Sequence, residues 1–66
     1  MTPTEATKLM GDAQALERAA HVLAREGEYA AAHTATNLAD ELRLQYNAWA
    51  ENRRQEAIAR MQKGKV

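Results

Sequence analysis

The residues of this chain best able to do chemistry are two histidines, His21 and His33, which lie six positions on either side of Gly27. Imidazoles at one level of a folded structure can bind a transition metal, or can titrate near neutral pH. Two nitrogen ligands do not complete a metal site, however, and the chain has no cysteine that could add a thiolate. We therefore interpret both histidines as solvent-exposed, and we expect neither a metal nor a cofactor.

A second group of side chains with chemical potential is aromatic and cationic. Tyr46, Trp49 and Arg53 follow one another at intervals of three and four residues, so a helix would place them on one face. Two interpretations are open: the aromatic residues form part of the core, or they form a binding hot spot, where Trp, Tyr and Arg concentrate. The candidate partner-binding residues are Tyr46, Trp49, Arg53, Arg54, Arg60 and Lys63.

No motif in the sequence names a reaction. The chain has neither a glycine-rich phosphate loop nor a nucleophile with a base beside it. A chain this short also offers little concave surface that could exclude water from a transition state. We therefore expect a protein that is not an enzyme and has no small-molecule substrate.

The elements that position these residues are two long runs of helical periodicity. Thr2-Pro3-Thr4-Glu5 marks a helix start, with Thr at the N-cap, Pro at the first helical position and Glu three residues after the cap. Gly27 is the only strong break before Gly64. The sequence predicts helices over about 3–26 and 28–61, a turn at about 27 and a basic tail over 62–66. The fold class is all-α, a single-domain antiparallel hairpin with the longer helix second.

Each predicted helix carries an apolar seam at spacings of three and four residues. Alanine alternates with leucine in the first seam, so a facing helix can approach closely at the alanines while the leucines fill the space between. The residues expected to form the core and a dimer interface are Leu9, Leu16, Leu23, Ala35 and Leu42. A chain of 66 residues gains roughly 3–5 kcal/mol from its core at best. We therefore expect a homodimer that forms a four-helix or coiled-coil-like bundle.

Charge separates the C-terminal end from the rest of the chain. The first helix is too short to pair with more than about residue 52, so residues 53–66 should overhang. This segment has five cations and one carboxylate, whereas residues 1–52 have four cations and eight carboxylates. The cations can act on their own helix by stabilising its dipole. Alternatively, they can contact an acidic partner, either a protein surface or nucleic acid phosphate.

The leading functional hypothesis from the sequence is a small regulatory or inhibitory protein that binds a partner protein through its second helix. The alternatives are a regulator that binds RNA or DNA through the basic segment, and a structural coiled-coil adaptor. The apolar runs are too short to span a membrane, and the N-terminus lacks the basic-then-apolar order of a secretory signal. We therefore expect a cytoplasmic protein, and the alanine-rich composition suggests a phage or other mobile-element gene.

Overall fold

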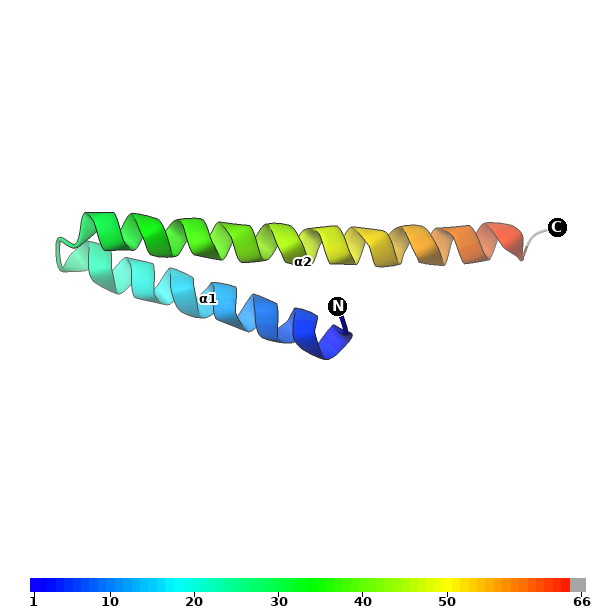
Figure 1. The fold of residues 1–66 in the computed structure, drawn as a ribbon, viewed down its shortest axis with the longest axis horizontal. Coiled ribbons are helices and arrows are strands. Elements are labelled where there is room, and N and C mark those ends of the chain that lie inside the picture. The colour runs from blue at the N-terminus through cyan, green and yellow to red at the C-terminus, as the bar shows by residue number, and fades with distance from the viewer. Residues whose placement is uncertain (65–66) are drawn as a thin grey trace.

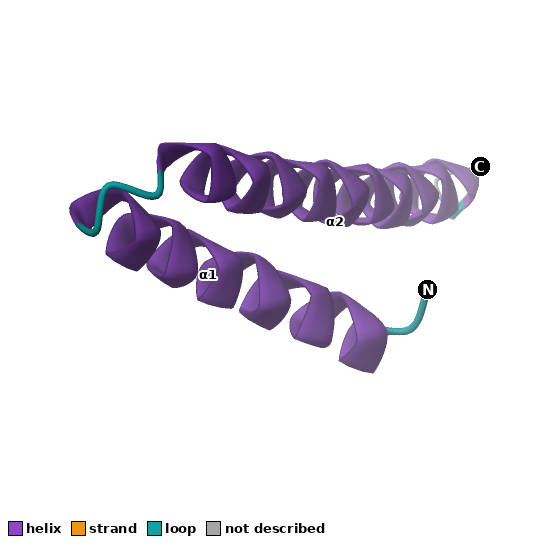
Figure 2. Cartoon of the chain, turned by 60° about the vertical axis from the view of Figure 1, so that its left-hand side comes forward, coloured by secondary structure: helices purple, strands orange, loops and turns teal. Residues whose placement is uncertain are grey.

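Two antiparallel helices joined by a short turn make up the fold (Figure 1). The computed structural model describes residues 1–64, in which α1 spans Pro3–Arg25 and α2 spans Tyr29–Lys63. The view in Figure 2 shows the same two helices with loop only at the turn and at the ends. The predicted all-helical hairpin is therefore confirmed. Lys65 and Val66, the end of the predicted basic tail, lie outside the described residues.

The start of α1 is fixed by a capping box. The Glu5 backbone N–H donates to the Thr2 hydroxyl at 3.1 Å, and the Thr2 backbone N–H donates to the Glu5 carboxylate at 3.3 Å. Pro3 occupies the first turn, where its missing N–H costs no helical hydrogen bond. This arrangement is the one that the sequence predicts.

The turn is built on the backbone of Gly27, which has a φ of 81°. The Gly27 N–H donates to the Ala24 carbonyl at 3.1 Å, and the Glu28 N–H donates to the Leu23 carbonyl at 2.9 Å. These two bonds form a Schellman motif, which satisfies carbonyls at the end of a helix. Because Glu26 is the C-cap in this motif, α1 ends at Arg25, one residue earlier than predicted.

The second helix is shifted toward the C-terminus relative to the prediction. It begins at Tyr29, since Glu28 serves as its N-cap and makes no side-chain capping bond. It continues to Lys63, two residues beyond the predicted end, and Gly64 is its C-cap. Residues 62 and 63 of the predicted tail are therefore helical, because nothing before Gly64 interrupts the backbone ladder.

The fully buried core consists only of alanine. In α1 the buried residues recur every seven positions, at Ala6, Ala13 and Ala20. In α2 they cluster toward the turn, at Ala32, Ala35 and Ala39. Small side chains let the two backbones approach closely. The leucines of the predicted seam do not lie between the helices but beside this contact line, and each is only half-buried. The core is therefore thin, since a buried methyl group contributes only about 0.8 kcal/mol.

The contact line divides the hairpin into two flanks of different chemistry. Leu9, Leu16 and Leu23 each follow a buried alanine by three residues, which places them on one side of α1. Glu17 follows Ala13 by four residues and lies on the other side, where it forms an ion pair with Arg43 of α2. We call the first side the leucine flank and the second the polar flank. The leucine flank comprises Leu9, Leu16 and Leu23 of α1 with Leu38, Leu42 and Trp49 of α2, whereas Ala35 of the predicted seam belongs to the buried core.

Candidate partner-binding surface

Trp49 is the centre of the aromatic group that the sequence singles out. Its indole Nε1–H donates to the backbone carbonyl of Met1 at 2.9 Å, which ties α2 to the N-terminus. The ring centroids of Tyr46 and Trp49 are 5.8 Å apart, and the guanidinium carbon of Arg53 lies 5.2 Å from the Trp49 ring centroid. The structure thus brings these three predicted site residues together. Both aromatic residues are half-buried, so each retains accessible surface.

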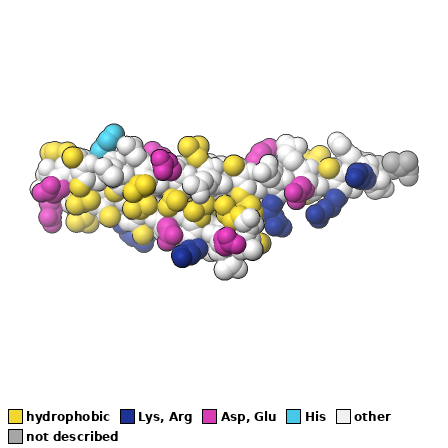
Figure 3. Space-filling model, viewed as in Figure 1, with side chains coloured by type: hydrophobic (Ala, Val, Ile, Leu, Met, Phe, Trp, Pro, Cys, Tyr) yellow, Lys and Arg dark blue, Asp and Glu magenta, His cyan; other side chains and the backbone are white. Residues whose placement is uncertain are grey.

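Beyond Trp49, α2 continues without a neighbouring helix. The heptad line that contains Ala32, Ala39 and Tyr46 reaches Arg53 and then Arg60 as it leaves the end of α1. All residues from 51 to 64 are exposed. We call residues 53–63 the overhang. Figure 3 shows Lys and Arg side chains along it, whereas hydrophobic side chains form a band along the line between the two helices.

The cations of the overhang differ in what they contact. Arg54 donates to the Glu51 carboxylate at 3.1 Å, so part of its charge is balanced within α2. Arg53 lies against Trp49. Within residues 1–64, neither Arg60 nor Lys63 forms an ion pair. Those two predicted site residues therefore have no competing partner in the described part of the chain.

The overhang also exposes apolar surface beside its cations. Ile58 is 42% exposed and Met61 is 67% exposed, and Ala57 lies one turn before Met61. A solvated helix gains nothing from large apolar side chains in water. Together with the cations, they give the overhang a mixed apolar and basic surface.

The leucine flank is the second surface left open by the hairpin. Four of its five leucines are half-buried, and the fifth, Leu38, is 45% exposed. Near the N-terminus it ends in a shallow groove that contains both carboxylates and apolar groups. The groove is lined by Met1, Glu5, Lys8, Leu9, Asp12 and Gln45. Because Gln45 of α2 meets Leu9 and Asp12 of α1 here, these rows of the two helices lie on the same side of the hairpin.

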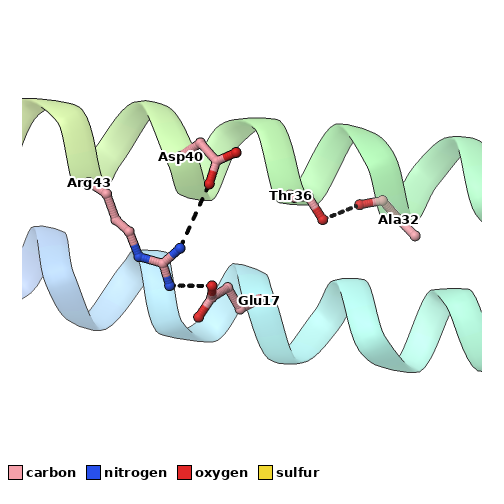
Figure 4. Close-up of polar contacts among 5 residues, drawn as sticks. All are labelled: Glu17, Ala32, Thr36, Asp40 and Arg43. Carbon is pink, nitrogen blue, oxygen red and sulfur yellow. Dashed lines mark hydrogen bonds and ion pairs between the residues drawn. The ribbon is translucent and has the colours of Figure 1, made fainter.

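The polar flank closes the opposite side with ionic contacts. Figure 4 looks at the hairpin from the reverse of Figure 1, since α2 lies above α1 in both views but its chain direction is reversed. Arg43 contacts Glu17 across the helices and lies 3.7 Å from the Asp40 carboxylate (Figure 4). Its hydrogen bond to Glu17 lowers the pKa of that carboxyl, and the same contact raises the pKa of Arg43. On this flank, one guanidinium therefore contacts two carboxylates.

The two histidines are both exposed, as predicted. Within residues 1–64, no three His, Asp or Glu side chains are grouped closely enough to hold a metal ion. In the same part of the chain, neither helix contains an apolar stretch long enough to cross a membrane.

Leu38 belongs to the open leucine flank, although the sequence prediction did not include it. It lies seven residues after Ala31 and seven before Gln45, and it is four residues before Leu42. The signal was therefore present as a second row of three and four spacing, adjacent to the predicted seam.

Comparison with protein-family models, curated proteins and solved structures finds no match to the chain.

Proposed function

We propose that this chain is a small, non-enzymatic regulatory protein of the cytoplasm, which self-associates and binds an acidic partner protein through the overhang of α2. The observation that carries the proposal is that α2 extends past α1 with exposed cations and apolar residues on one continuous helix. A helix with this composition fits a groove or helix pair of opposite charge.

The preference for a protein over a nucleic acid partner rests on the apolar component of the overhang. Phosphate contacts need cations but no aliphatic side chains. Ile58 and Met61 are exposed next to the basic residues, and such side chains gain free energy only when a partner removes them from water. Nucleic acid binding is the runner-up function, since Arg53, Arg60 and Lys63 form a cationic row.

Self-association is the second part of the proposal. It rests on the leucine flank, where half-buried leucines from both helices remain partly accessible, and on the buried core, which contains only alanine. A second copy seated on this flank would supply the apolar contacts that the hairpin lacks, and a four-helix bundle is the usual result. Substitution Leu16→Asp should abolish the dimer in light scattering, because it places a charge in the new core. A dimer that survives this substitution would contradict the proposed interface.

Partner binding is tested with two variants that change charge equally. Arg60→Glu lies on the overhang and Arg18→Glu lies on an exposed face of α1. Tagged wild-type protein and both variants are used to capture proteins from a lysate of the source cells. We expect one stoichiometric partner with wild type and Arg18→Glu, and its loss with Arg60→Glu. Equal capture by all three proteins would contradict a binding role for the overhang.

The nucleic acid alternative predicts a different result with the same proteins. Affinity for a labelled RNA or DNA duplex would fall steeply as salt rises, with a slope set by the number of phosphates contacted. Fluorescence anisotropy at several salt concentrations measures this slope. Salt-dependent binding that Arg60→Glu weakens would favour the runner-up function, provided that no protein partner is recovered.

A further inference from the structure

A row of residues along α2, which includes Leu38, Leu42 and Trp49 of the leucine flank, has internal symmetry. The row is Ala31, Ala35, Leu38, Leu42, Gln45 and Trp49, with successive spacings of four, three, four, three and four. Read in either direction from residue 40, the spacing is the same. When two such rows cross in opposite directions about residue 40, Leu38 meets Leu42 and Ala31 lies opposite Trp49, while Ala35 is already buried in the hairpin.

The dimensions of the hairpin point to the same centre. The midpoint of α1 (Pro3–Arg25) is residue 14, and the part of α2 that faces it, residues 29–51, has its midpoint at residue 40. Complete antiparallel overlap of two hairpins therefore also sets residue 40 at the two-fold axis. Because a row with alternating spacings of four and three is also symmetric about neighbouring midpoints, the helix lengths select residue 40 among them.

Charge distinguishes this arrangement from its parallel alternative. With the axis at residue 40, residues 53 and 54 of one copy lie at the height of residues 27 and 26 of the other. The overhang therefore begins, with Arg53 and Arg54, beside the acidic turn that contains Glu26 and Glu28. A two-fold axis along the helices would instead set the two basic overhangs side by side, where like charges repel.

We infer that a second copy of this chain covers the leucine flank in an antiparallel arrangement, with Arg53 and Arg54 of each copy against Glu26 and Glu28 of the other. This inference rests on the self-association part of the proposed function and adds its geometry. The rest of each overhang, including Arg60 and Lys63, then projects from opposite ends of the dimer, so the two partner-binding segments are far apart.

The distance between the two overhangs tests the inference directly. The chain has no cysteine, so Gln62→Cys introduces a single, exposed attachment point for a nitroxide label. In the antiparallel dimer, residue 62 of each copy lies beyond the turn of the other copy, 22 residues from the axis, which separates the two labels by about 65 Å at 1.5 Å per residue. In the parallel dimer, they would be under about 30 Å apart. We expect the long distance in pulsed dipolar spectroscopy, and a short distance or a monomeric protein overturns the inference.

A charge exchange tests the contact between the overhang and the turn. Arg53→Glu with Arg54→Glu should raise the dimer dissociation constant about tenfold, and Glu26→Lys with Glu28→Lys should do the same. The protein with all four substitutions should regain dimer affinity, because the attraction is restored with its signs reversed. Sedimentation equilibrium gives the dissociation constants of the wild type and of the three variants. If the four substitutions together weaken the dimer further, the assigned contact is wrong.

The possible failures can be told apart. A monomer at all concentrations removes both the antiparallel geometry and the self-association part of the proposed function. A dimer with a short label distance overturns the geometry alone. Loss of partner capture in Arg60→Glu concerns the far end of the overhang and has no bearing on either dimer experiment.

Discussion

Two glycines in this chain have opposite energetic roles, because their backbone conformations differ. Gly27 has a φ of 81°, a region that side-chain-bearing L-residues rarely adopt, and it allows the two capping bonds of the turn. Gly11 lies inside α1, and a methyl group added there would meet no atom within 4 Å. Substitution of alanine at the two positions therefore reports the effect of backbone conformation on stability, because the added methyl group meets no atom within 4 Å at either position.

Gly27→Ala should lower the free energy of unfolding by about 1–2 kcal/mol, because the left-handed conformation is strained for alanine. Gly11→Ala should raise it by about 1 kcal/mol, because alanine stabilises a helix interior. Urea unfolding at one protein concentration measures both changes. Destabilisation by both substitutions would contradict the open environment of Gly11.

The ion pair of the polar flank makes a pH-dependent contribution to stability. Because Arg43 lowers the pKa of Glu17 in the folded protein, the folded state favours the ionised carboxyl. Its contribution is present above the unfolded-state pKa, about 4.3, and is lost as pH falls through the folded-state pKa.

Arg43→Gln should therefore reduce the loss of stability on acidification from about pH 5 to pH 3, and it should return the pKa of Glu17 toward its ordinary value. Arg18→Gln is the matched control, since Arg18 is adjacent to Glu17 in sequence but points to another side of the helix. An NMR titration of the Glu17 carboxyl carbon follows both variants. An unchanged Glu17 pKa in Arg43→Gln would contradict the assigned cause.

Individual residues show which features a sequence reveals and which it does not. The capping box at Thr2 and the turn at Gly27 depend on bonds between residues at most five positions apart, so both could be predicted. The pairing of Glu17 with Arg43, and of Trp49 with the Met1 carbonyl, depends on the lateral offset of two helices. That offset depends on which alanines form the contact line between the helices. The alternating pattern of alanine and leucine in the sequence does not determine which alanines these are.

At the scale of elements, α2 consists of a supported part and an unsupported part. Residues 32–50 pack against α1, whereas the overhang is held by its own backbone hydrogen bonds and a few side-chain contacts. Helices gain most of their stability in proteins from packing of one face, and isolated segments of this length are marginal in water. The overhang is therefore the segment best suited to be ordered further by a partner.

Amide hydrogen exchange should show this division within one helix. We expect low protection over residues 56–63 and much higher protection over residues 35–46, because local fraying opens the overhang without unfolding the hairpin. The captured partner should raise protection over residues 56–63. Equal protection along the whole of α2 in the protein without a partner would contradict the division.

The element boundaries also show the limits of periodicity. The sequence predicted both helices and the overhang from capping signals and the length of α1, but the helix ends differ from the structure by one or two residues. It ended α2 at residue 61 where the structure continues to Lys63, because a weakening apolar pattern does not itself terminate a helix.

At the scale of the whole molecule, the hairpin has one side closed by charges and one side open with leucines. A core of alanines brings the helices close together, but it leaves the larger apolar side chains beside the contact line. The central claim is that a second copy of the chain covers this leucine flank. The part of the overhang beyond Arg54 then remains free in each subunit to bind another molecule.

Two substitutions of the same kind on α2 test this claim most directly. Leu38 lies on the leucine flank at 45% exposure, and Leu44 lies on the side of α2 away from α1 at 69% exposure. Aspartate at either position costs the isolated hairpin little, because both leucines already contact water. In sedimentation equilibrium, the wild type and Leu44→Asp should each have two chains per particle. Leu38→Asp should have one chain per particle. A single chain in the wild type, or two chains in Leu38→Asp, would contradict the claim.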